Sequence, residues 1–270
     1  MAKVGLYVNR SKVDYSDDFK AQLFSWFEKK RWEIVDNWDQ DGGQASELNF
    51  ILSLGGDGTV LQAARKAAFF SIPVLGVNFG RLGFLCEVER GEIYSALEKV
   101  IKDEYTIEER MMMSATVSGQ KKEFQHIVLN DVVFLKENTD SIITLQMRLS
   151  GEPVESPPAD GLILATPTGS TAYSLSAGGP LVSPDVEAIL ITPVAAHSLS
   201  SRPMVVSCRE KIEVTLAKET TCRVIFDGRQ MIKLRAEETV RIEASSMKAK
   251  FIRLEGRSFP KMVREKLRDR

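Results

Sequence analysis

The chain has 270 residues, of which 43% are hydrophobic and 27% are charged, as is usual for a globular protein. This length suffices for one large domain or two ordinary ones. The formal net charge of -1 gives no overall electrostatic reason to bind nucleic acid or an anionic membrane. We therefore expect neither a nucleic-acid partner nor a membrane partner.

The three cysteines lack the paired spacing of a metal site or a disulfide framework, so we expect reduced thiols. No apolar stretch approaches the ~20 residues that a membrane-spanning helix needs. The amino-terminal residues show no signal-peptide cleavage site. These features favour a cytoplasmic location.

Strand and helix patterns alternate over the first hundred residues. We expect strands at 4–8, 32–35, 50–54 and 72–78, a helix capped by Ser16, and a loop at 40–44. Such alternation is typical of an open sheet of parallel strands, here a Rossmann-like α/β domain. In such sheets, ligands bind at the carboxyl ends of the strands.

The turn after the strand at 50–54 reads Gly55-Gly-Asp-Gly-Thr59, and an alanine-rich helix pattern follows it. Glycines permit a sharp turn and leave the backbone open to a ligand. A turn that opens a helix presents free N–H groups and a positive dipole end, which suits phosphate. Asp57 repels phosphate unless a metal or a proton transfer requires it. The alternative is an ordinary turn in which Asp57 caps the helix.

From about residue 107, apolar and polar residues alternate with a period of two, for example at 143–149 and 212–216. Asp227-Gly228 lies between two such runs and predicts a hairpin. The second half is therefore expected to be antiparallel β, in two packed sheets that form a β-sandwich. The last ten residues predict either a short charged helix or a frayed tail.

A second motif interrupts the alternation between Ala159 and Pro180. It is rich in glycines and hydroxyl side chains, which let a flat ligand approach the backbone and form hydrogen bonds. Tyr173 offers a ring for stacking. The alternative is a polar loop with a short capped helix.

With these motifs, the chain resembles the NAD kinases. Residues 55–59 match the family's G-G-D-G-T motif, and residues 160–180 match its long glycine- and hydroxyl-rich signature. Residues 78–84 and Asn130-Asp131 fit the intervening blocks. Phosphofructokinases and diacylglycerol kinases carry versions of the first motif, whereas the second motif is highly specific.

The resemblance implies an α/β domain at 1–107 and an all-β NAD-binding domain at 108–249, with 250–270 packing back on the first. It implies transfer of the γ-phosphoryl group of ATP to the adenosine-ribose 2′-hydroxyl of NAD, giving NADP. A divalent metal, Mg²⁺ or Mn²⁺, is expected, and so is a homodimer or homotetramer.

The resemblance also implies that Asp57 is the catalytic residue, either as a general base or as a carboxylate linked to the metal. No other metal ligand is predicted. The expected contacts to the phosphates and the dinucleotide are Gly56, Gly58, Thr59, Phe84, Asn130, Asp131, Asp160, Thr171, Ala172, Tyr173, Ser176 and Ala195.

Some of these positions leave alternatives open. Asn130 and Asp131 are expected to bind ribose hydroxyls, but many family members carry Asn-Glu, so Asp131 is one methylene shorter. Asp131 could instead be a solvated residue at a strand end. Arg81 could bind phosphate or simply extend from its loop.

Two other functions fit parts of the sequence. A lipid kinase of the diacylglycerol type would share the first motif, but the chain lacks an amphipathic membrane helix, and such kinases lack the stretch ending at Tyr173. An inactive NAD(H)-sensing module would not need an intact Asp57.

Overall fold

The computed structural model describes residues 1–270 except 11–15, 37, 40–44, 81, 82, 120–122, 139–141, 157, 199, 218–220, 257, 269 and 270. The loop expected at 40–44 and the position of Arg81 therefore lie outside the described residues. The chain forms two compact units, one of residues 1–109 with 247–270 and one of residues 110–246.

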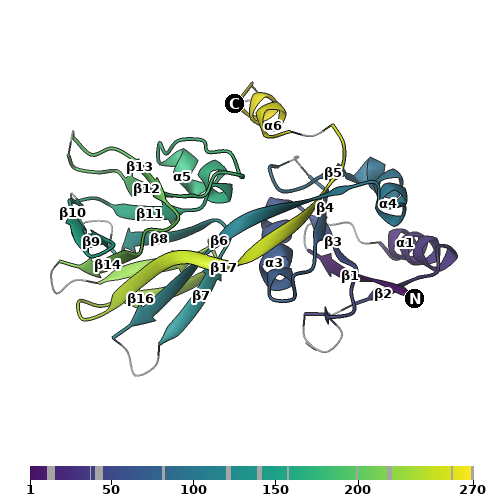
Figure 1. Ribbon diagram of the computed structural model, residues 1–270, viewed down its shortest axis with the longest axis horizontal. Helices are drawn as coiled ribbons and strands as arrows, with labels where there is room; N and C mark the ends of the chain where they lie inside the picture. The colour runs from purple at the N-terminus through teal and green to yellow at the C-terminus, as the bar shows by residue number, and fades with distance from the viewer. Residues whose placement is uncertain are drawn as a thin grey trace. The chain divides into compact units, whose positions relative to one another are not determined.

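The first unit is an α/β layer structure (Figure 1). Its elements are β1 (Ala2–Val8), α1 (Asp17–Lys29), β2 (Trp32–Val35), β3 (Phe50–Gly55), α3 (Asp57–Ala68), β4 (Val74–Asn78), β5 (Val88–Glu89), η1 (Arg90–Glu92), α4 (Ile93–Ile101), the end of β17 (Thr239–Arg253) and α6 (Phe259–Arg268). The strand order is β2-β1-β3-β4, and β4 also pairs with β5 and with the end of β17. These pairings are parallel, which confirms the predicted open α/β sheet.

Local sequence explains these elements. The Ser16 side chain accepts a hydrogen bond from the backbone N–H of Phe19 at 3.3 Å and so caps α1 as predicted. Apolar side chains of α1 and α4 pack with those of β1, β3 and β4 in one core cluster. The strand β3 is buried over its whole length, as a central parallel strand should be.

The second unit contains two β-sheets. One has the order β10-β9-β14-β17, with β6 beside β17 and β7 beside β6, and the other has the order β13-β12-β11-β8-β15-β16. Its elements are β6 (Thr106–Ser118), β7 (Phe124–Val128), β8 (Asp131–Lys136), β9 (Leu145–Leu149), β10 (Glu152–Val154), β11 (Gly161–Ala165), η2 (Thr168–Thr171), α5 (Tyr173–Ser176), β12 (Ala188–Val194), β13 (Met204–Ser207), β14 (Ile212–Leu216), β15 (Cys222–Phe226) and β16 (Gln230–Leu234).

One apolar core joins the two sheets of the second unit. It includes Met147, Val214 and Ile242 from the first sheet and Leu164 and Phe226 from the second. Strands β15 and β16 form the hairpin predicted from Asp227-Gly228, and both of these residues have positive φ. The predicted β-sandwich is thus confirmed.

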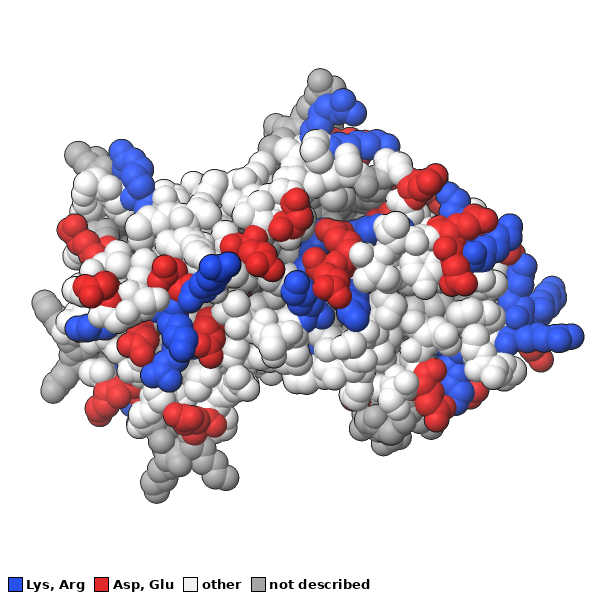
Figure 2. Space-filling model, viewed as in Figure 1, with Lys and Arg blue, Asp and Glu red and all other residues white. Residues whose placement is uncertain are grey.

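The chain ends in helix α6, so of the two expectations for the last ten residues, the helix is the one observed. Among the described residues, no helix is long and apolar enough to cross a membrane. On the face that Figure 2 shows, basic and acidic side chains are intermixed.

Candidate functional site

The glycine turn lies at the carboxyl end of β3, at the point where the strand order of the first unit reverses. The chain proceeds from β1 to β2 on one side and from β3 to β4 on the other. Asn9 directly follows β1, and its side-chain amide lies 3.4 Å from the hydroxyl oxygen of Thr59. Such a reversal is the usual ligand site of an open α/β sheet.

Each residue of this turn has a distinct environment. A Cβ on Gly55 would lie 2.3 Å from Oγ1 of Thr59, so only glycine lets that buried side chain pack there. Gly56 is the N-cap of α3 and no side chain caps the helix. At Gly56 and Gly58, open space lies where a Cβ would stand. The helix start is therefore accessible to a ligand, and the alternative of Asp57 as the N-cap is wrong.

The carboxylate of Asp57 is held by three consecutive backbone N–H groups, which we call the Asp57 cradle. Oδ2 accepts a bond from Phe84 at 2.6 Å, and Oδ1 accepts bonds from Leu85 and Cys86 at 3.1 Å each. A Cβ at Gly83 would lie 2.0 Å from this carboxylate, so the glycine is required for its close approach. The side chain is thereby fixed in direction beside the open start of α3.

A second carboxylate binds backbone in the same way in the second unit. Asp227 accepts bonds from the N–H groups of Leu129, Asn130 and Asp131 at 3.0, 2.8 and 3.1 Å. We call this the Asp227 cradle. Its aspartate is buried, with 7% exposure, and has a φ of 47° in the β15–β16 turn. It fixes the backbone of two predicted ribose-binding residues.

Asp131 lies beside this cradle and is only 4% exposed, so the alternative of a solvated strand-end residue is wrong. Burial in the protein, and secondarily the charge of Asp227, raises the pKa of Asp131 to about 7. The neighbouring Asn130 is partly exposed, and its side-chain oxygen is buried with no hydrogen-bond partner among the described residues. That oxygen can accept a hydrogen bond from a donor such as a hydroxyl.

The second motif begins where β11 ends and packs on Asn130. The N–H of Thr166 donates to the carbonyl of Asn130 at 2.9 Å. A Cβ on Gly169 would lie 2.1 Å from the same carbonyl, so this glycine is needed for η2 to pack there. The motif contains the short helix α5, which no side chain caps.

The predicted contacts in η2 and α5 differ in exposure. Thr171 and Ala172 are partly exposed, and Ser176 is exposed. Tyr173 is 40% exposed at the start of α5, so it is not a core residue. Its ring is free enough to stack on a flat ligand.

Asp160 and Ala195 lie at the opposite end of β11 from these groups. Asp160 precedes the strand and pairs with Lys136 at 2.7 Å, while Ala195 follows Val194, which pairs with Gly161. Five residues of strand span roughly 15 Å. The predicted dinucleotide residues of the second unit thus form two groups rather than one.

Two residues of these arrangements were not predicted from the sequence as site residues. Asn9 could have been inferred, because it is the polar residue directly after the first strand. The sequence around Asp227 indicates only a hairpin. Its partners lie 96 to 98 residues away, and no local pattern marks them.

Comparison with known proteins identifies the family. The ATP-NAD kinase N-terminal domain matches residues 9–105, and the ATP-NAD kinase C-terminal domain matches residues 129–254. The NAD kinase of Desulforamulus reducens is 39% identical over 100% of this chain and 98% of its own. The chain belongs to the NAD kinase family. The NAD kinase of Caldanaerobacter subterraneus subsp. tengcongensis is 38% identical, with both chains covered in full.

Solved structures agree with membership of the NAD kinase family. A structure of an NAD kinase from Archaeoglobus fulgidus in complex with ATP has a TM-score of 0.76 and 27% identity, and covers 94% of each chain. Yeast NADH kinase complexed with NADH shares the fold, with a TM-score of 0.86 at 22% identity over 99% of this chain and 87% of its own. The Asp57 cradle falls within the first matched domain of the family and the Asp227 cradle within the second.

Proposed function

We propose that the protein transfers the γ-phosphoryl group of ATP to the 2′-hydroxyl of the adenosine ribose of NAD, giving NADP and ADP. Its membership of the NAD kinase family supports this reaction, as does the relative solved with ATP. Membership of this family favours the reaction over the two alternatives, a lipid kinase and an inactive sensor of NAD(H).

The observation that carries the proposal is the Asp57 cradle. A carboxylate has about four lone-pair sites. Among the described residues, the N–H groups of Phe84, Leu85 and Cys86 occupy three of these sites, and we assign the fourth, on Oδ2, to the substrate. In our proposal this site accepts the hydrogen bond of the 2′-hydroxyl, orients its oxygen toward the γ-phosphorus and takes its proton as the new O–P bond forms.

Phosphoryl transfer depends on positioning and on neutralising charge more than on covalent chemistry. We assign the phosphates of ATP to the open start of α3, at Gly56 and Gly58, with Thr59 supporting the turn. Mg²⁺ or Mn²⁺ would arrive on the phosphates as part of the substrate and would neutralise their charge. Among the described residues, no group of three or more His, Cys, Asp or Glu side chains could hold a metal, and a metal carried by phosphates does not need one.

We assign the dinucleotide to the remaining predicted residues. Phe84 would border the adenine, Asn130 and Asp131 would take ribose hydroxyls, and Tyr173 would stack on a ring. The partly or fully exposed Thr171, Ala172 and Ser176 would also contact the dinucleotide. We also propose that Asp160 and Ala195, at the other end of β11, contact the dinucleotide. The homodimer or homotetramer and the cytoplasmic location also stay predictions, and light scattering of the purified protein tests the first.

A direct assay tests the function. The protein is incubated with NAD, ATP and magnesium, and NADP is read with an NADP-specific dehydrogenase. We expect NADP to form only when both substrates are present. Absence of NADP with the folded parent protein would contradict the proposal, and phosphorylation of NADH to NADPH in place of NAD would change the assigned acceptor.

A further inference from the structure

The segment that forms the Asp57 cradle is bonded on its other side by the carboxyl-terminal strand. Nη1 of Arg253, at the end of β17, lies 3.4 Å from the carbonyl oxygen of Leu85. The backbone N–H of Leu85 donates to Oδ1 of Asp57. One peptide segment thus connects the aspartate to a residue almost 200 positions later in the chain (residue 57 and residue 253).

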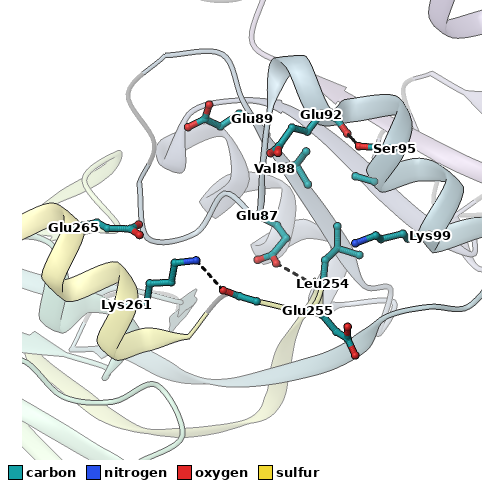
Figure 3. A pocket seen from close by; sticks show the side chains of 12 residues that line it. Glu87, Val88, Glu89, Glu92, Ser95, Lys99, Leu254, Glu255, Lys261 and Glu265 are labelled. Atoms are coloured by element: carbon teal, nitrogen blue, oxygen red, sulfur yellow. Dashed lines mark hydrogen bonds between the residues drawn. The ribbon is translucent and has the colours of Figure 1, made fainter.

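Glu87 completes this connection. One oxygen of its carboxylate pairs with Nη1 of Arg253 at 2.8 Å, and the other accepts a bond from the N–H of Leu254 at 3.0 Å. Its backbone N–H donates to the carbonyl of Gly76 at 2.8 Å. Figure 3 shows Glu87 and its bond to Leu254 at the wall of a pocket of about 490 Å³.

Charge-assisted bonds hold together the cluster of Glu87, Glu108 and Arg253, in which Glu87 is buried and Arg253 largely so. The side chains of Glu87 and Arg253 are 2% and 12% exposed. Glu108 binds Nε of the same guanidinium, and the guanidinium lies over the ring of Phe251. Charge-assisted hydrogen bonds in such surroundings are short and directional, so they limit the movement of the backbone that they hold.

We propose that Arg253 and Glu87 are positioning residues for the reaction. They hold the backbone at 84–86 and, through its N–H groups, the direction of the Asp57 carboxylate. The inference rests on the catalytic role proposed for Asp57. Loss of the guanidinium frees the Leu85 carbonyl and one side of the segment, so the free lone pair of Asp57 no longer faces the reacting hydroxyl in a fixed direction.

Single variants give the first test, with kcat, the KM values for NAD and ATP, and urea unfolding as readouts. Misplacement of a catalytic group by about 1 Å can lower rates about 100-fold, so we expect Arg253→Gln to lower kcat about 30- to 100-fold. The KM for ATP should stay within about threefold, because its phosphates are assigned to the start of α3. The KM for NAD should change less than kcat, because Phe84 is the one dinucleotide contact that we assign within residues 84–86.

Arg253→Lys keeps the charge and one donor and should recover part of the loss. Glu87→Gln keeps the bond to Leu254 and should lower kcat about tenfold.

Arg241→Gln is the matched control. Arg241 is on the same strand but in the second unit, and its guanidinium pairs with Glu213 through Nε and Nη2 at 3.2 and 3.1 Å. Its kcat should stay within about twofold of the parent's, as expected for an exposed ion pair.

The Asp57→Asn background gives the decisive test. If Arg253 acts through Asp57, the two changes are not additive, and Arg253→Gln should lower the residual turnover of Asp57→Asn less than about threefold. An equal fold-loss in both backgrounds, or a loss proportional to the unfolded fraction, would overturn the inference and leave the cluster a stabilising one. If Arg253→Gln does not fold, the same comparison is made with Arg253→Lys and Glu87→Gln.

The two proposals fail in different ways. Parental turnover in Arg253→Gln, with Asp57→Asn impaired, overturns only the positioning role. Parental turnover in Asp57→Asn overturns the catalytic assignment of Asp57 and, with it, the positioning role.

Discussion

Asp57 and Asp227 each hold three consecutive backbone N–H groups, but their surroundings differ. Asp57 stands between two glycines at the open start of a helix, whereas Asp227 is 7% exposed within a hairpin turn. The first aspartate is partly exposed, and the second is buried against the backbone that it binds. The same bonding pattern thus fits a reacting group in one unit and a scaffold in the other.

The electrostatic settings differ as well. The Asp57 carboxylate lies in the first turn of α3, where the helix dipole stabilises a negative charge by about 0.3–1 kcal/mol. Beside Asp227 lies a second carboxylate, Asp131, whose pKa is raised to about 7 by burial and by the charge of Asp227. One cradle therefore stabilises a single charge, while the other brings two acids close together at the predicted ribose site.

The largest effect should come from Asp57→Asn. The amide cannot accept a proton, and loss of a positioned general base typically lowers the rate about 10²–10⁴-fold. NAD should still bind, because the variant changes one contact to the 2′-hydroxyl and leaves the other assigned dinucleotide contacts in place. Initial rates of NADP formation measure the loss of turnover, and calorimetric titration with NAD measures the binding. Turnover within threefold of the parent would make the Asp57 cradle a scaffold like the other one.

Local patterns account for the parts of the fold that were predicted correctly. The buried run at 50–54, the cap at Ser16 and the Asp227-Gly228 turn each act within a few residues, so the sequence displays them directly. The cradles differ from these because their partners lie far along the chain. Asp57 finds its partners 27 to 29 residues later, and Asp227 binds residues 96 to 98 positions earlier.

The candidate site was predicted as a set of residue types rather than as an arrangement. Motif matching selected Asn130, Asp131 and Tyr173, but it could not show that Asp131 is buried or that Asp160 lies at the other end of β11. Those properties follow from the register of β8, β11 and β12. Register depends on how the whole sheet pairs, which no single motif specifies.

Asp227→Asn should lower the stability of the protein, whereas Asp57→Asn should lower its turnover. Asn keeps the size of the side chain and tolerates a positive φ. However, its NH₂ group replaces one carboxylate oxygen and would face a backbone N–H, so that two donors meet. An unsatisfied buried donor costs about 1–3 kcal/mol, so we expect about 3 kcal/mol less free energy of unfolding. Urea unfolding measures this loss. Unchanged stability, or a fall in kcat as large as that of Asp57→Asn, would contradict the scaffold role.

Asp131→Asn tests the pair of acids through pH. The folded pKa of about 7 lies above the ordinary 3.8, so the folded state keeps a proton that the unfolded state has lost. The stability due to this group is fully present below about pH 4 and falls as pH rises toward 7. The neutral amide does not titrate. The free energy of unfolding of the variant relative to the parent should therefore rise by about 2–3 kcal/mol between pH 5 and 7.

Urea unfolding at several pH values measures this difference, and a difference that stays constant with pH would contradict the burial of an acid at residue 131. Asp131→Glu adds a methylene group where only 4% of the residue is exposed. We expect it to weaken NAD binding, since overpacking a buried site displaces its neighbours.

The smallest effect is expected at Tyr173, which is 40% exposed in the motif that packs on the backbone of the Asp227 cradle. Base–aromatic stacking is worth about 1–3 kcal/mol, and we expect the lower part, about 1–2 kcal/mol of NAD binding, for a ring that is only partly exposed. Tyr173→Ala should lose this affinity with little change in the KM for ATP, whose phosphates are assigned to the start of α3. Tyr173→Phe keeps the ring and should bind NAD like the parent. If Phe weakens binding as much as Ala, the hydroxyl makes the contact rather than the ring. If Ala leaves the calorimetric NAD titration unchanged, Tyr173 does not contact the dinucleotide.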